Sequence, residues 1–369
     1  MKQIKGGVTA AKGYEAASTA AGIKYQGRTD MALIYSQVPC VSAGTFTTNV
    51  VKAAPVKWDR QIVDSGAGVQ AVVVNSGIAN ACTGEEGMGY CKETAEAAAE
   101  ALNIDAAGVL VGSTGVIGMQ LPMQKLVDGI QVLAGKKAEG LQSGHDAALA
   151  IMTTDTVEKE MAVEIEIGGK TVTIGGMSKG SGMIHPNMCT MLAFITTDAA
   201  ITKEALQKAL SEDVEDTYNM ISVDGDTSTN DTAILLANGL AGNQEITYAS
   251  PEYETFKEAL HMVNETLAKK MAGDGEGATA LFEVKVVGAE SIKQAKTLAK
   301  SVVCSNLTKA AIAGHDANWG RILCAMGYSG VQFDPEKVDL FFESKAGKLQ
   351  IIENGVATDY SEEVATRFI

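Results

Sequence analysis

The chain has 369 residues, which is enough for two domains of ordinary size and a well-developed interior, so a mini-protein is excluded. Hydrophobic residues make up 46% and charged residues 20% of the chain, a composition typical of globular rather than disordered proteins. The 30 Lys and Arg against 45 Asp and Glu give a net charge of −15, the wrong sign for binding nucleic-acid phosphates.

The pattern of residues predicts alternating strands and helices along the chain. The expected elements are strands 31–35, 44–48 and 69–74, helices 93–102, 122–133 and 144–152, a hairpin of 158–167 and 170–174, helices 203–210 and 251–271, strand 281–287 and helix 290–303. Pro122 opens one helix, and Ser250 is expected to cap the helix that starts at Pro251. The glycine-rich segment 273–277 is the best boundary, so we expect domains at 1–275 and 276–369.

Four windows contain no charged residue: 31–51, 65–84, 106–124 and 180–197. Each is interrupted by Gly and by hydroxyl or amide side chains, which a membrane-spanning helix would avoid. We therefore interpret them as core strands that end in polar loops, and no membrane association is expected. In an acidic chain, such loops are places where a buried polar site could be assembled.

The six cysteines contain no C-x-x-C pair and do not cluster, which favours reduced thiols over a disulfide or zinc framework. The first seven residues are followed by no apolar stretch of the kind that a secretion signal contains. A cytoplasmic protein is therefore expected.

Two possible metal motifs are incomplete. Residues 224–230 resemble the start of a calcium loop, but Thr229 occupies the position that needs Gly, and Leu235 the position that needs a bidentate Glu. His185 and Cys189 are four residues apart but have no evident third or fourth ligand for zinc. No metal is expected, and no cofactor is indicated.

Residues 176–180 match the G-x-S-x-G pattern that places a nucleophilic serine, here Ser178, on a strand-to-helix turn. Gly180, Gly182 and Pro186 follow, however, and would break the helix that the turn requires. A serine hydrolase is therefore disfavoured.

The same glycine-rich loop leads to Thr190, at the first position of an apolar strand. From the residues alone, two interpretations stay open. Thr190 could be a β-branched residue that starts a core strand. Alternatively, its hydroxyl could attack the Cys189 carbonyl and cleave the chain, which would leave Thr190 as an N-terminal nucleophile with its own α-amine as base.

Seven segments resemble those of one family in the same order: 75–84, 113–118, 153–156, 179–192, 224–231, 273–279 and 316–321. The chain closely resembles the ornithine acetyltransferases (glutamate N-acetyltransferases), the bifunctional arginine-biosynthesis proteins, over essentially its whole length. The resemblance implies an α/β fold with a layered helix–sheet–sheet–helix core of the N-terminal-nucleophile type and a smaller α/β C-terminal domain. It also implies cleavage at Cys189–Thr190 into an α chain of 189 residues and a β chain of 369 − 189 = 180 residues, assembled as an α2β2 heterotetramer.

The activity that the resemblance implies is ping-pong transfer of acetyl from N2-acetylornithine through Thr190 to glutamate. Thr114 and Gly115 match the family's oxyanion hole, and Thr153, Lys179, Thr190 and Glu276 match its substrate contacts. Lys179 would pair with a substrate carboxylate and keep the Thr190 amine neutral, unless it is a solvated loop lysine. Glu276 would pair with the ornithine cation, unless it is only a loop carboxylate.

The chain departs from the family at three points: Cys189 replaces the usual Ala, Ala280 replaces a Lys, and the chain ends at Ile369, before a terminal segment that supplies an Asn and a hydroxyl. We therefore expect a C-terminal domain truncated relative to the family, with weakened substrate binding. The alternatives are an aminopeptidase or amidase of the same architecture, in which water replaces glutamate, and an inactive truncated chain. The use of acetyl-CoA as a second donor is left open.

Overall fold

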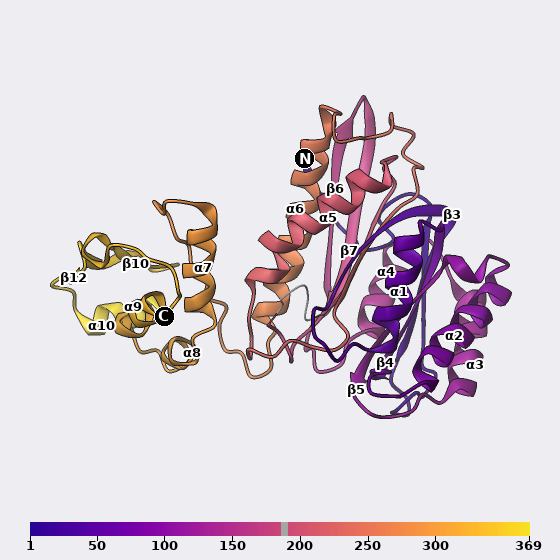
Figure 1. Ribbon diagram of the computed structural model, residues 1–369, viewed down its shortest axis with the longest axis horizontal. Helices are drawn as coiled ribbons and strands as arrows, with labels where there is room; N and C mark the ends of the chain where they lie inside the picture. The colour runs from indigo at the N-terminus through magenta and orange to yellow at the C-terminus, as the bar shows by residue number, and fades with distance from the viewer. Residues whose placement is uncertain (186–190) are drawn as a thin grey trace. The chain divides into compact units, whose positions relative to one another are not determined.

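The computed structural model describes residues 1–185 and 191–369. Contacts divide the chain into two units, Met1–Glu276 and Gly277–Ile369. Figure 1 shows the helices and strands of both units. None of the helices in the described residues is long and apolar enough to cross a membrane.

The first unit contains a nine-stranded sheet and six α-helices among its described residues. Its strands are β1 (Lys2–Ile4), β2 (Tyr14–Thr19), β3 (Met31–Phe46), β4 (Val69–Ile78), β5 (Val109–Val116), β6 (Lys159–Ile167), β7 (Lys170–Lys179), β8 (Leu192–Thr197) and β9 (Thr232–Ala237). Its helices are α1 (Ala54–Ser65), α2 (Glu86–Leu102), α3 (Met123–Lys136), α4 (Leu141–Ala150), α5 (Lys203–Asp216) and α6 (Glu252–Gly273). The strand order is β1-β6-β7-β8-β9-β3-β4-β5, and β2 pairs with β3.

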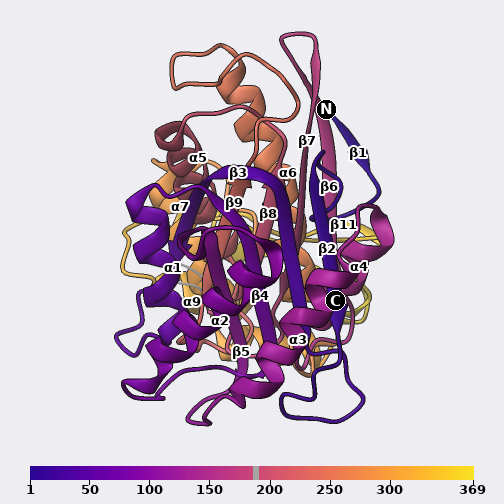
Figure 2. The same cartoon turned by 90° about the vertical axis from the view of Figure 1, so that its right-hand side faces the viewer.

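The sheet has two layers, and the long strand β3 contributes to both. Its residues 31–36 pair with β2 and β4, whereas residues 41–46 pair with β9, and the register shifts between Tyr35 and Cys40. Figure 2 shows β3 as a long arched ribbon that runs from one group of strands to the other. Because a strand exposes alternate side chains on opposite faces, the two layers can enclose a core between them.

Three hydrophobic cores follow from this alternation. Ala193 and Ile195 of β8 pack with the apolar side of α5 and α6, whereas Leu192 and Phe194 point to the core between the layers. That middle core also holds Val72 and Val74 of β4, while Ala71 and Val73 pack on the other side with α2 and α3. The unit is therefore a helix–sheet–sheet–helix α/β structure, which confirms the expected fold class.

The hairpin over 158–174 is confirmed by the pairing of β6 with β7. Gly168 and Gly169 have φ of 57° and 74°, the left-handed geometry that a two-residue hairpin turn needs at both positions. The uncharged windows likewise contain β3, β4, β5 and β8, as expected. The two strands predicted at 31–35 and 44–48 are one continuous strand.

Two local predictions are wrong. Residues 281–287 form no strand, because this segment has no hydrogen-bonded strand partner in the described part of the chain. Ser250 does not cap α6: Pro251 holds the cap position, and the Ser250 hydroxyl accepts a hydrogen bond from the Thr247 amide instead.

The second unit is smaller and has its own core. Its elements are helices α7 (Ile292–Val303), α8 (Asn306–Ala313), α9 (Trp319–Gly327) and α10 (Glu362–Ala365), and strands β10 (Leu340–Ser344), β11 (Gly347–Glu353) and β12 (Val356–Ala357). The strands form an antiparallel sheet, and Ile351 and Ile352 of β11 and Ala365 of α10 are fully buried.

Candidate active site

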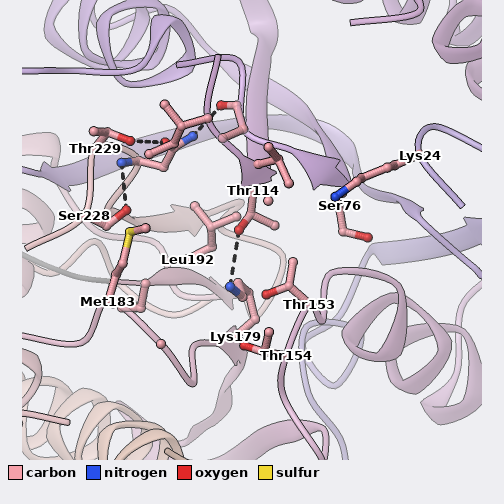
Figure 3. Close-up of a pocket in the computed structure, with 18 of the residues that line it drawn as sticks. Lys24, Ser76, Thr114, Thr153, Thr154, Lys179, Met183, Leu192, Ser228 and Thr229 are labelled. Atoms are coloured by element: carbon pink, nitrogen blue, oxygen red, sulfur yellow. Dashed lines mark hydrogen bonds between the residues drawn. The ribbon is translucent and has the colours of Figure 1, made fainter. Parts of the chain in front are cut away.

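A cavity of about 480 Å³ opens in the first unit where several strands end (Figure 3). Its lining consists of Lys24, Tyr25, Arg28, Asp30, Ser76, Gly77, Ala79, Thr114, Gly115, Val116, Ile117, Thr153, Thr154, Lys179, Gly182, Met183, Met191, Leu192, Asp224, Ser228, Thr229, Asn230, Asp231 and Glu276. Its volume is in the range of small-molecule sites, and charged side chains of both signs line it.

Thr114 and Gly115 lie side by side near the end of β5. Gly115 has φ of 130°, and a Cβ atom there would lie 2.2 Å from the carbonyl carbon of Gly77 on the parallel strand β4. Only glycine can occupy such a position, since any side chain would collide with backbone. This close approach fixes the turn that carries the Thr114 hydroxyl into the cavity.

Lys179, at the end of β7, reaches across to this turn. Its Nζ donates a hydrogen bond of 3.2 Å to Thr114 Oγ1, as the centre of Figure 3 shows. Because the ammonium group can only donate, the hydroxyl oxygen is the acceptor and its own proton is free for another partner. Burial lowers the pKa of Lys179 below its ordinary value, although the nearby Asp155 carboxylate acts in the opposite direction.

A buried ionic network holds the loops around Lys179. Lys159 is fully buried, and its ammonium group bonds Asp155 at 2.7 Å and Asp274 at 2.6 Å. Asp155 also accepts hydrogen bonds from the amides of Gly180 at 2.7 Å and Thr153 at 3.0 Å. One cation therefore joins three segments of the chain: the loop that carries Thr153, the end of β7 at Lys179, and the residues after Asp274.

This network also shifts the acidity of its carboxyl groups. Burial opposes the ionisation of Asp155, but the Lys179 and Lys159 ammonium groups hold its pKa below the ordinary value. For Asp274, burial likewise acts upward, and the bond from Lys159 prevails and lowers the pKa. Both groups are therefore carboxylates at neutral pH.

Glu276 follows Asp274 closely and lies at the rim of the cavity. Its amide donates a 2.9 Å hydrogen bond to the Ser181 carbonyl, and its carboxylate lies against Gly182, where an added Cβ would be 2.5 Å from Oε1. The side chain is exposed, which leaves its charge available to a ligand.

Five predicted site residues therefore line one cavity: Thr114, Gly115, Thr153, Lys179 and Glu276. Cys189 and Thr190 lie outside the described residues, and the cavity includes Met191 and Leu192, which follow them. The individual roles of these residues stay predictions.

The rejected motifs lie in different surroundings. Ser178 is buried inside β7, which continues past it to Lys179, so no strand-to-helix turn forms there. The Asp224 carboxylate accepts hydrogen bonds from the amides of Ile184 and Asp226, each at 3.0 Å, as in an ordinary polar turn. In the described part of the chain, no group of three His, Cys, Asp or Glu side chains is arranged to hold a metal ion.

Several other residues of the cavity received no role from the sequence, among them Asp231, which lies in the family-like segment 224–231. Asp231 is 1% exposed, and neither of its carboxylate oxygens has a well-aligned hydrogen-bond donor among the described residues. Burial raises its pKa well above the ordinary value, although the nearby Ser228 and Thr47 hydroxyls and Lys179 act against this. Lys24 and Arg28 come from the loop before β3, which reaches the cavity only through the fold.

This α/β fold, with its polar cavity beside a glycine-dependent turn, is the architecture of an enzyme that acts on a small molecule. The model of the ArgJ family matches residues 15–369. The chain is 53% identical to the arginine biosynthesis bifunctional protein ArgJ of Symbiobacterium thermophilum, over 100% of this chain and 90% of that protein. It is 52% identical to the ArgJ protein of Thermotoga neapolitana, over 93% of this chain and 86% of that one. The chain therefore belongs to the ArgJ family, the bifunctional acyltransferases of arginine biosynthesis.

Two solved structures are also similar. A crystal structure of the arginine biosynthesis bifunctional protein argJ from Bacillus halodurans shares 44% identity, covers 50% of this chain and 96% of its own, and has a TM-score of 0.49. The structure of ornithine acetyltransferase complexed with ornithine from Mycobacterium tuberculosis also shares 44% identity, covers 49% and 95%, and has a TM-score of 0.45.

Proposed function

We propose that this protein moves the acetyl group of N2-acetylornithine to glutamate through an acetyl-Thr190 intermediate, after self-cleavage between Cys189 and Thr190. Family membership supports the general activity. The observation that carries the mechanism is the Lys179–Thr114–Gly115 arrangement in a cavity that also includes Met191, the residue after the proposed nucleophile.

In the first half-reaction, the Thr190 hydroxyl oxygen attacks the acetyl carbonyl carbon. A C–O bond forms, and the hydroxyl proton passes to the α-amine of Thr190. The amide C–N bond then breaks, and ornithine leaves with that proton on its new amine. In the second half-reaction, the neutral amine of glutamate attacks the ester carbonyl carbon, a C–N bond forms, and one amine proton passes to the α-amine of Thr190. The ester C–O bond then breaks, the Thr190 oxygen takes that proton, and N-acetylglutamate leaves.

Each tetrahedral intermediate carries negative charge on the former carbonyl oxygen. The free proton of the Thr114 hydroxyl and the amide of Gly115 are suited to stabilise that charge, because both belong to a turn fixed by close packing. A nearby Lys179 cation disfavours a second positive charge, which helps to keep the Thr190 amine in its neutral, basic form.

Substrate binding draws on the same cavity. We assign the α-carboxylate common to both amino acids to Lys179 and Thr153, and the ornithine ammonium group to Glu276, whose carboxylate is exposed at the rim. The scheme uses no metal or cofactor, and it takes the protein to be a cytoplasmic α2β2 assembly of the two cleaved chains.

The test is to follow the loss of N-acetylornithine with and without glutamate. The proposal predicts loss that depends on glutamate and yields N-acetylglutamate in equal amount. Loss at the same rate without glutamate, with acetate as product, would instead identify an amidase. No loss in either assay, and no acetyl group on Thr190, would identify an inactive chain. Replacing N-acetylornithine by acetyl-CoA in the same assay decides whether that donor is also used.

A further inference from the structure

In the proposed reaction, the cavity binds two amino acids whose side chains carry opposite charges. Ornithine and glutamate share an α-amino-acid group, but the side chain of one ends in an ammonium group and that of the other in a carboxylate. In a ping-pong scheme both bind beside the same acetylated residue, so one cavity must accommodate opposite charges in turn. The Glu276 carboxylate suits the ammonium group of ornithine, but it would repel the side-chain carboxylate of glutamate.

Among the described residues, three cationic side chains line the cavity, and two of them already form hydrogen bonds. Lys179 is bonded to Thr114 and is 8% exposed. Arg28 donates hydrogen bonds of 2.7 and 2.9 Å to the carbonyls of Met152 and Thr153, so its guanidinium group holds the loop that carries Thr153.

Lys24 is the third cation, and no acidic side chain of the described residues forms an ion pair with it. Its ammonium group lies 4.8 Å from the centre of the Tyr25 ring, and the side chain is half-buried. In Figure 3 the amine of Lys24 extends into the cavity beside Ser76, on the side facing Thr114. The ammonium group of Lys24 is therefore available to an anionic group of a bound substrate.

The loop that carries Lys24 is held in place by Asp30. The two carboxylate oxygens of Asp30 accept hydrogen bonds from the amides of Ala21 at 2.7 Å and Ile23 at 2.6 Å. The side chain of Lys24 also packs on Gly77, where an added Cβ would lie 3.1 Å from the Cβ of Lys24. Because Gly77 is the residue against which Gly115 packs, Lys24 is tied to the turn of the proposed oxyanion hole.

We propose that Lys24 binds the side-chain carboxylate of glutamate and so selects the acetyl acceptor, while Glu276 serves the side chain of ornithine. This inference rests on the proposed acetyl transfer. It separates the two substrates at the end of the side chain and leaves their common α-amino-acid group to Lys179 and Thr153.

The test compares two reactions of the same enzyme. One is transfer from N-acetylornithine to glutamate; the other is exchange of isotope-labelled ornithine into N-acetylornithine, which needs no glutamate. Lys24→Met is expected to raise KM for glutamate by about 10- to 100-fold, the effect of losing one charge-assisted hydrogen bond. KM for ornithine in the exchange reaction should change far less. Lys24→Arg, which keeps the charge, should recover most of the affinity for glutamate.

Lys92→Met is the matched control, because Lys92 is exposed on α2, outside the cavity lining, and its ion pair is with Glu96 on the same helix. It should change neither KM. An equal rise in both KM values for Lys24→Met would show that Lys24 binds the shared α-amino-acid group, and an unchanged KM for glutamate would show that it binds neither; each result overturns the inference. If the unmodified enzyme transfers no acetyl group to glutamate, the proposed function itself fails.

Discussion

At the scale of single residues, the candidate site depends on Gly115. A Cβ added at Gly115 would lie 2.2 Å from the Gly77 carbonyl carbon. The parallel strands β4 and β5 therefore approach more closely here than a residue with a side chain would allow. Thr114, the next residue back, is thereby fixed where Lys179 can donate to its oxygen. The proposed oxyanion donor is the Thr114 hydroxyl, whose position depends on a glycine and on a buried cation.

Replacing the hydroxyl of Thr114 tests this arrangement. Thr114→Val keeps the shape of the side chain but removes one of the two proposed donors to the tetrahedral intermediate. We expect kcat to fall by about 10²- to 10³-fold, or roughly 2.7–4 kcal/mol, with little change in KM. Steady-state kinetics on the processed enzyme measure both constants, and a variant with normal kcat would show that the oxyanion is stabilised elsewhere.

Sequence patterns were informative about the residues that carry motifs and silent about those that reach the cavity through the fold. Thr114, Gly115, Thr153, Lys179 and Glu276 come from four separate segments, and the structure gathers them. Lys24 belongs to no motif. Its position depends on the hydrogen bonds by which Asp30 holds the loop before β3, and on the packing of Lys24 against Gly77 of β4.

At the scale of elements, the strands were easier to predict than their partners. The uncharged window 31–51 indicated strand, but it was predicted as two strands, 31–35 and 44–48, because the local pattern does not show that one strand, β3, contributes to both layers. Helix α1 was not among the predicted helices; its buried face includes Asp59, which bonds the Val111 amide at 2.8 Å and interrupts the apolar pattern. Partner choice and polar core positions are tertiary effects that local patterns do not encode.

The Lys159 network gives a prediction at this scale. Lys159→Met would remove the ammonium group that is bonded to the buried carboxylates of Asp155 and Asp274 and would leave only Lys179 near Asp155. We expect the free energy of unfolding at pH 7 to fall by about 3–5 kcal/mol. Lys2→Met, which removes a surface ion pair of 3.9 Å, is the control and should have little effect. Denaturant unfolding measures both.

The same network fixes the direction of a pH effect. Because the pKa values of Asp155 and Asp274 are lowered in the folded protein, their stabilisation is present above the ordinary carboxyl pKa of about 3.9 and is lost as pH falls through the lowered values. The difference between the unmodified protein and Lys159→Met should therefore shrink in acid. A difference that stays constant down to pH 2 would show that lost packing, and not charge, causes the instability.

At the scale of the whole molecule, the proposed cleavage would fall within one sheet. Strand β7 precedes Cys189, and β8 follows Thr190; the two strands pair along 174–179 and 192–197. Next to β8, β9 pairs with β3. Strands β8 and β9, which follow the cleavage point, therefore lie between β7 and β3, which precede it. The two chains would therefore share a core and remain associated.

This topology predicts that the processed protein migrates as one species under native conditions and separates only when it is denatured. Size-exclusion chromatography before and after denaturation measures this. Separation of the two chains without denaturant would contradict the shared-sheet account. The smaller unit, Gly277–Ile369, comes after the cleavage point in the sequence. It would therefore stay on the β chain.

The central claim is that Thr190 becomes an N-terminal residue and carries the acetyl group. The most direct test is the intact mass of the denatured protein after incubation with N-acetylornithine alone, followed by addition of glutamate. We predict two chains of 189 and 180 residues, with the second heavier by one acetyl group before glutamate is added and back at its unmodified mass afterwards. Thr190→Ala should give a single chain that gains no acetyl group. A wild-type protein that stays as one chain yet transfers acetyl to glutamate would contradict the account.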